Sequence, residues 1–326
     1  MTLLTSCLFP VSNALCILFR PHSAVRELAS KAKRSVLADV AARYLRYTSV
    51  VLLSFLSYGV LPHPGVRAQK WALDWVLLVI SRNMVIVYIA YGMFHWLLYE
   101  CEWTRKKWRS QKFWDANLRE DGSLDTSKGY NPVRDRWLTT VGVVCASILE
   151  CVVLHLWAIG QWDSYGDLMS QPVRSLLLAL ALPYWADIHF FVIHRLIHPW
   201  CPRKFGRFDI GKFFYRHVHS VHHKSYNTGP WSGLAMHPVE QLLFFSSILV
   251  PIAHHPMHLY LGLFHKLIAP LAGHDGYATP GGDGYFHFLH HKYFEVNYGS
   301  PAVPLDRIFG SFSDGTQWSN KPDRKD

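Results

Sequence analysis

The chain has 326 residues, of which 50% are apolar and 15% aromatic, while only 17% are charged. Soluble domains carry charge on roughly a quarter of their residues, so this composition argues against a disordered chain, a coiled coil and an ordinary soluble enzyme. Lys and Arg exceed Asp and Glu by 33 to 23. Without a basic helix or a zinc-finger spacing, this excess indicates contact with anionic lipid headgroups and no nucleic-acid partner.

The first apolar run covers residues 3–19 and is interrupted by Pro10. No basic segment precedes it and no small-x-small cleavage site follows it, which argues against a cleaved signal peptide. Two alternatives stay open for this run, a weak membrane anchor and an interfacial or disordered end.

Three pairs of apolar runs follow, and a bilayer core needs about 20 helical residues to be crossed. They cover residues 47–61 with 72–99, 138–160 with 173–193, and 239–253 with 257–273. Arg82 and Asn83 lie within the second run, so we expect it to tilt, to bend or to pair these groups with a neighbour. The last pair is short enough to form a shallow re-entrant hairpin.

The distribution of basic residues predicts which ends of these runs face the cytosol. The segment from Arg20 to Arg46 holds seven Lys/Arg and that from Arg105 to Arg136 holds nine, an excess typical of cytoplasmic loops. In residues 103–114 Trp and Phe alternate with basic residues, which is typical of an aromatic belt beside a membrane. The predicted fold is therefore an all-α, polytopic membrane helical bundle with a cytosolic, histidine-rich helical cap.

Histidine is unusually frequent, with 16 of the 20 histidines between His189 and His291. They form an H-x-x-x-H pair on an apolar helix and two H-x-x-H-H boxes, which would each present three imidazoles on one compact arc if helical. The eight box histidines are His194, His198, His219, His222, His223, His287, His290 and His291.

Eight clustered imidazoles exceed what one ion can coordinate, so this pattern predicts two metal ions with several His ligands each. Neutral imidazole suits iron, zinc, copper and nickel. Hydrolytic zinc sites usually use three protein ligands, whereas breaking an unactivated C–H bond of a lipid needs an oxidant, which iron with dioxygen provides.

Asp187 is interpreted as an outer acceptor that orients His194; a solvated or capping aspartate is the alternative.

At these boxes the chain resembles the fatty acid hydroxylase/sterol desaturase superfamily of membrane di-iron oxygenases. The resemblance runs from about Pro183 to Phe312, and its first-box spacing and His274-Asp-Gly element are closer to the sterol C5-desaturase and C4-methylsterol oxidase branch. Besides the histidine boxes, it rests on Met236-His237-Pro238-x-Glu240, His274-Asp275-Gly276-Tyr277, Asn297-Tyr298-Gly299 and Asp306-Arg307-x-x-Gly310.

The resemblance implies two non-haem iron ions held by the eight box histidines and His274, with O2 as co-substrate. It also implies electrons from cytochrome b5 and its reductase, or from a ferredoxin-like donor in bacteria. Two roles stay open for His237: it is either an outer partner of the ligands or a lining residue of the substrate pocket. Pro270 replaces an extra histidine of the ceramide-type hydroxylases, which leaves a tenth ligand in doubt.

We therefore expect an N-terminal membrane hairpin and basic segment in residues 1–135, a catalytic domain in 136–315 and a polar tail in 316–326. The expected function is O2-dependent hydroxylation or desaturation of a lipid, most simply a sterol or sterol-like ring. The alternatives are a fatty acid or sphingolipid hydroxylase of the same superfamily, or a histidine-rich membrane metal transporter. The expected location is the endoplasmic reticulum in a eukaryote, or the inner membrane in a bacterium.

Overall fold

The computed structural model describes residues 36–60, 64–101, 119–120, 123–163, 167–200, 209–249, 255–276 and 283–315. The run 3–19, the aromatic-basic segment 103–114 and the polar tail 316–326 lie outside these residues. Within the described ranges the chain is helical and has no β-strand, and an isolated bridge pairs Ser300 with Val303. The prediction of an all-α fold is confirmed.

Five long helices form the body: α3 (Val36–Val60), α4 (Leu73–His95), α6 (Pro132–Ala158), α7 (Pro172–Leu196) and α10 (Pro256–His274). The shorter α-helices are α8 (Ile210–His217), α9 (Pro238–Phe245), α11 (Asp283–Tyr293) and α12 (Leu305–Phe309). Helix α4 continues into a π turn, η2 (Trp96–Glu100), and the 3-10 turns are η1 (Gly65–Gln69), η4 (Thr126–Lys128), η5 (Leu168–Ser170), η6 (His219–Lys224), η7 (Pro230–Leu234) and η8 (Ser246–Leu249).

In the part of the chain that the structure describes, three helices are long and apolar enough to cross a membrane: Leu73–Glu100, Pro132–Ala158 and Pro172–Leu196. They match the predicted runs 72–99, 138–160 and 173–193 within a few residues. Helix α6 begins earlier than its apolar run because the Asn131 side chain accepts from the backbone N–H groups of Val133 and Arg134, with Pro132 in the first helical position.

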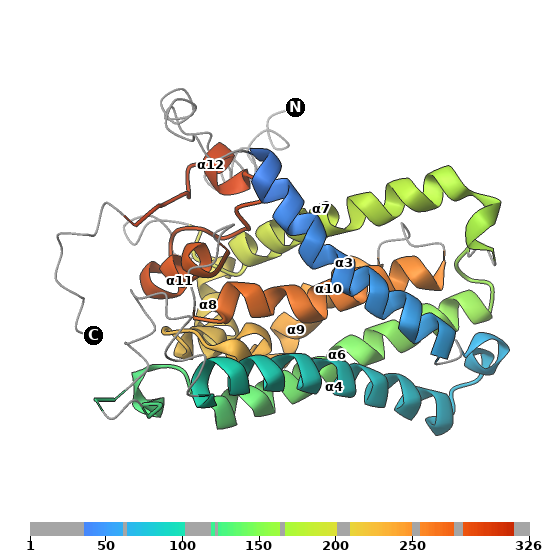
Figure 1. Cartoon of the computed structure of the whole chain (residues 1–326), viewed down its shortest axis with the longest axis horizontal. Coiled ribbons are helices and arrows are strands. Elements are labelled where there is room, and N and C mark those ends of the chain that lie inside the picture. Colours follow the sequence, from blue (N-terminus) through green and yellow to red (C-terminus); the bar gives the residue numbers. More distant parts are fainter. Residues whose placement is uncertain are drawn as a thin grey trace, which may run out of the picture.

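Helix α10 is the central element and packs against α3, α7, α11 and η7, while α6 packs against α4 and α9. The histidine-rich helix α11 and α8, the helix that leads into the His219–His223 box, gather at one end of the long helices, where α4 ends, α6 begins and α7 ends (Figure 1). Close packing there depends on glycine, since a Cβ on Gly233 would lie 2.9 Å from the Pro270 carbonyl oxygen of α10. The turn η7, which follows the His219–His223 box, thus packs directly on α10.

A buried polar network joins α4, α6 and α10. The Arg82 guanidinium pairs with the Glu150 carboxylate, and the Asn83 amide donates to that carboxylate at 2.9 Å and to Ser147 Oγ at 3.0 Å. The guanidinium also lies 4.7 Å from the ring centroid of Tyr260. Of the outcomes expected for the polar residues in this run, pairing with a neighbouring helix is the one observed.

Candidate metal centre

Four segments bring histidines to one place. Helix α7 supplies His194, and His198 follows two residues after its last residue. The other ligand candidates come from η6, the C-terminus of α10 and α11. All nine are buried, at 0–6% exposure: His194, His198, His219, His222, His223, His274, His287, His290 and His291.

The nine side chains divide into two groups. His194, His198, His219, His223 and His290 form the five-histidine group, and His222, His274, His287 and His291 form the four-histidine group. Within each group, one ligand atom per residue can be chosen so that all lie within 4.8 Å of one another. Both α11 and η6 contribute histidines to each of the two groups. The two groups are therefore adjacent and are built from the same segments.

The distances between ring nitrogens fit metal coordination. Nε2 of His219 lies 3.0 Å from Nε2 of both His194 and His223, and Nε2 of His223 lies 3.1 Å from that of His290. Two nitrogens bound to one ion at about 2.1 Å lie about 3.0–3.4 Å apart at octahedral or tetrahedral angles. The lone pairs of the five-histidine group therefore converge as a cation requires.

The four-histidine group has the same geometry. Nε2 of His274 lies 3.3 Å from Nε2 of His222 and 3.1 Å from that of His291. In addition, both ring nitrogens of His198 and Nε2 of His287 are buried without a hydrogen-bond partner. Buried nitrogens without partners are costly unless something else satisfies them, so the donor set fits two cations with several imidazole ligands each.

The opposite ring nitrogens are anchored to the backbone. Nδ1–H of His194 donates to the Tyr298 carbonyl at 2.6 Å, and those of His274 and His290 donate to carbonyls four and six residues away at 2.7 Å. Donation from Nδ1 leaves the lone pair on Nε2, the nitrogen that faces the group. The carbonyls thus fix both the tautomer and the orientation of the rings.

Burial also keeps the imidazoles neutral. It lowers the pKa of His219 to about 3 and that of His222 to about 4, and it lowers the pKa of His223 as well, helped by neighbouring histidines. A neutral ring has a free lone pair, so these side chains are ready to ligate a metal at neutral pH.

Glu240 is a functional candidate that the sequence reasoning did not identify. This buried residue of α9 accepts from Nδ1–H of His219 through Oε1 at 2.6 Å. Burial raises the pKa of Glu240 to about 8, a shift that the neighbouring His222 and His237 oppose. Its position four residues after Met236 in the quoted motif was the available signal, but the spacing alone could not show which histidine it meets.

Asp187 is placed differently from the interpretation based on helical angle. Its Oδ2 accepts from Ser300 Oγ at 2.7 Å, while Nδ1 of His194 donates to the Tyr298 carbonyl. The direct contact expected between Asp187 and His194 is wrong, because the returning chain at Tyr298 occupies that side of the ring. Asp187 instead holds the segment that carries this carbonyl.

His237 lies outside both histidine groups. It is the N-cap of α9, where its Nδ1 accepts from the Val239 backbone N–H at 3.2 Å. The following Pro238 occupies the first helical position. His237 thus caps the helix that carries Glu240 to His219.

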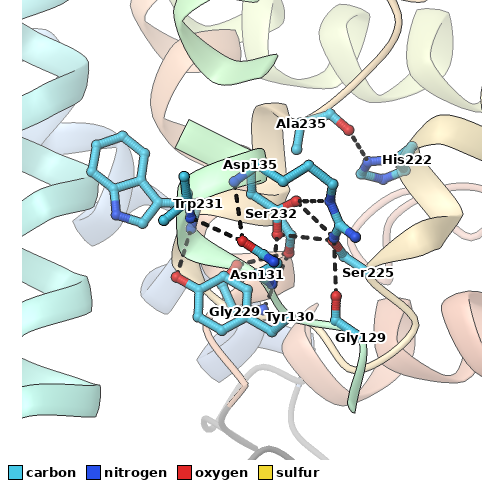
Figure 2. A network of polar contacts seen from close by, with 12 residues as sticks. Gly129, Tyr130, Asn131, Asp135, His222, Ser225, Gly229, Trp231, Ser232 and Ala235 are labelled. Carbon is cyan, nitrogen blue, oxygen red and sulfur yellow. Dashed lines mark hydrogen bonds and ion pairs between the residues drawn. The ribbon is translucent and has the colours of Figure 1, made fainter. Parts of the chain in front are cut away.

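Figure 2 shows the polar network that holds the second histidine box against α6. Ser225 Oγ donates to Asp135 Oδ2 at 2.9 Å and accepts from Arg134 Nη2 at 2.6 Å, which ties the segment after the box to the first turn of α6. Nδ1 of His222 donates to the Ala235 carbonyl at 3.3 Å. The box is a 3-10 helix, and these contacts fix a conformation that helical spacing alone did not predict.

Comparisons with known proteins agree with this geometry. The fatty acid hydroxylase family model matches residues 179–311, which include all nine histidines. A Δ7-sterol 5(6)-desaturase of Aspergillus fumigatus is 32% identical over 155 residues, covering 38% of this chain and 45% of the relative. Lathosterol oxidase of Rattus norvegicus is 26% identical over 171 residues, covering 49% and 53%.

A very-long-chain aldehyde decarbonylase of Oryza sativa is 30% identical over 156 residues, covering 42% of this chain and 57% of the relative. The chain spans about half the length of the curated relatives it matches. No solved structure matches it significantly. Residues 179–311 therefore match the fatty acid hydroxylase family, and the chain is similar to sterol desaturases and to lathosterol oxidase.

Proposed function

We propose that this protein is a membrane-bound, non-haem di-iron oxidoreductase that hydroxylates or desaturates a lipid. The observation that carries the proposal is the convergence of nine buried imidazoles in two adjacent groups at one end of a membrane-type helical bundle. The nine histidines act as the iron ligands, with Glu240 and the Tyr298 carbonyl holding two of them in place.

Two iron ions with O2 supply the oxidising power that an unactivated C–H bond requires. Hydroxylation consumes one O2, two electrons and two protons and releases one water, while desaturation removes two hydrogens from the lipid and releases two waters. The side chains of this protein orient the centre and exclude water from it, since every candidate ligand is buried. Placement of the lipid to within about an ångström then decides between the two outcomes.

The relatives support a sterol or sterol-like substrate, because several of them are named for oxidation or desaturation of sterols. A long-chain aldehyde is the second candidate, supported by the similarity to aldehyde decarbonylases of rice. A metal transporter is disfavoured because the histidines gather at one end of the bundle, whereas a transport path would place ligands along the spans.

Electrons come from a separate donor in this proposal, either cytochrome b5 with its reductase or a ferredoxin-like protein. An exposed basic surface supports an acidic donor: Lys212 and Arg216 lie one turn apart on α8, and Lys224 ends η6. Tyr215, from the same helix, has its ring centroid 5.1 Å from that of His198. The basic surface is therefore close to the five-histidine group.

We further propose that residues 136–315 form the catalytic domain and that its histidine-rich end faces the cytosol. The basic segments Arg20–Arg46 and Arg105–Arg136, which run into the first turns of α3 and α6, support this orientation by the excess of positive charge on cytosolic loops. In a eukaryote the membrane is that of the endoplasmic reticulum, and in a bacterium it is the inner membrane.

Lipid profiling tests the function directly. Cells with the intact gene and cells expressing His290→Ala are compared, and the precursor that accumulates in the variant identifies the substrate and the step. Purified protein should contain about two iron ions per chain and form product only with O2 and a reductant. Zinc in place of iron, together with metal-dependent flux across vesicles, would instead establish transport.

A further inference from the structure

A second buried polar cluster lies beside the metal centre and contains none of its ligands. Lys266 of α10 is 2% exposed, and its Nζ donates to the Phe244 carbonyl at 2.8 Å. The same nitrogen lies 3.4 Å from Nδ1 of His189 on α7, whose Nε2 lies 3.1 Å from Ser246 Oγ. We call Lys266, His189 and Ser246 the polar cluster.

The hydrogen bonds determine which atoms of the polar cluster carry protons. Ser246 Oγ donates to the Leu243 carbonyl at 2.8 Å, so it accepts from His189, which must carry its proton on Nε2. Nδ1 of His189 is then the acceptor for Lys266. Ser246 keeps a free lone pair and Lys266 a third N–H, so the cluster can still accept and donate one hydrogen bond each.

The cluster is close to the metal ligands. The Lys266 ammonium lies 4.0 Å from the ring centroid of Phe244, whose ring lies 5.8 Å from that of Phe190. Phe190 in turn stacks on His194 at 4.9 Å. His189 precedes His194 by five residues, or about 7.5 Å along the axis of α7. Two phenyl rings separate the polar cluster from the five-histidine group.

This side of the molecule is open to lipid. Of the three membrane-type helices α7 is the least covered, with 22% of its apolar window buried. His189, Phe190 and Ser246 are all half-buried, so a molecule that moves along α7 can meet both the polar atoms and the phenyl ring beside the ligands.

We propose that His189, Ser246 and Lys266 form the binding site for a hydroxyl group of the lipid substrate. The inference rests on the proposed function and names the substrate class more closely. Because the polar cluster is separated from the ligands by only two rings, the hydroxyl and the oxidised carbon must be a few bonds apart. A ring lipid with a hydroxyl on or next to the oxidised ring meets this condition, and a fatty acid oxidised in mid-chain does not.

Binding of two matched sterols to the metal-free protein in detergent tests this site without requiring turnover. The probes are radiolabelled lathosterol, which carries a 3β-hydroxyl, and its 3-deoxy analogue. We expect lathosterol to bind about 3- to 10-fold more tightly, the range for one or two net hydrogen bonds. Ser246→Ala and Lys266→Met should abolish the preference, while Ser246→Thr, which keeps the hydroxyl, should retain it.

Ser175→Ala is the matched control, since it removes a hydroxyl at the opposite end of α7. Equal binding of the two sterols to the wild type, a preference that survives in both Ser246→Ala and Lys266→Met, or binding of neither sterol overturns the hydroxyl site. The proposed function is judged separately: if lipid profiling shows oxidation of a fatty acyl chain, lipid oxidation stands and the hydroxyl site fails.

Discussion

His222 and His290 each donate from Nδ1 to a backbone carbonyl, which leaves Nε2 facing the other histidines. We expect His222→Ala and His290→Ala to abolish turnover and to lower the iron content, because each removes one member of a different group. Inductively coupled plasma analysis of purified protein measures the iron, and fractionation checks membrane insertion.

The control for these variants is His217→Ala, which changes an exposed histidine two residues before the box. It should leave both iron content and turnover unchanged. Full activity of His222→Ala or His290→Ala would show that these rings are not ligands.

Glu240 and Asp187 differ in how directly they act on the ligands. Glu240→Gln replaces the carboxyl group that accepts from His219 with an amide, so metal affinity should fall by about 10- to 100-fold. Asp187→Asn should have a smaller effect, because Asp187 acts through Ser300 on the segment that carries the Tyr298 carbonyl. Titration of the metal-free protein with Fe²⁺ measures both affinities, and equal losses would place Asp187 among the direct partners.

Acid should destabilise the metal-free protein. The pKa of His219 is about 3 and that of His222 about 4 in the fold, against about 6.5 in an unfolded chain. Below about pH 6.5 the unfolded chain therefore binds more protons, and at pH 5 each of these two histidines lowers the unfolding free energy by about 2 kcal/mol.

Thermal unfolding of chelator-treated protein in detergent at pH 7.5 and pH 5 measures this loss. His219→Gln should show a smaller drop in Tm between the two pH values than the wild type does. An equal drop in the variant would mean that other groups govern the acid response.

At the scale of elements, the Arg82–Glu150 pair joins α4 to α6 inside the apolar body. Glu150→Ala leaves a buried, unpaired guanidinium, which costs roughly 3–5 kcal/mol, whereas replacing both partners by apolar residues is often neutral. We therefore expect a large drop in Tm for Glu150→Ala and recovery in Arg82→Met/Glu150→Leu. A double variant as unstable as the single one would refute this account.

The helices themselves were largely predictable from the sequence, because apolar length is a strong signal. Their ends were not, since the start of α6 depends on the cap made by Asn131 and Pro132 rather than on hydropathy. The H-x-x-H-H box at His219–His223 forms a 3-10 turn held by tertiary contacts at Ser225 and Ala235, which its spacing alone did not predict.

The residue types of the site were also predictable, because clustered imidazoles with fixed spacing have few other uses. Which histidine joins which group was not, since His222 and His223 are adjacent in the chain and belong to different groups. The outer partners were missed for the same reason: Glu240 and the Tyr298 carbonyl reach the ligands only after α9 and the C-terminal segment have packed.

For the whole molecule, the charge pattern predicts the orientation. Reporter tags placed after Arg109 and after Lys224 should map to the same side of the membrane, because two spans, α6 and α7, separate them. A tag after Asp163, between these two helices, should map to the other side. Tags after Arg109 and Lys224 on opposite sides would overturn the topology.

The division of α11 between the two groups has a consequence for assembly. His290 completes the five-histidine group, while His287 and His291 belong to the four-histidine group. Neither group is complete until α11 has packed into place, and α11 is the last of the ligand-bearing segments to be synthesised. We therefore expect the two ions to bind only after the whole domain has been synthesised. Binding of the first cation orders α11 and so favours binding of the second.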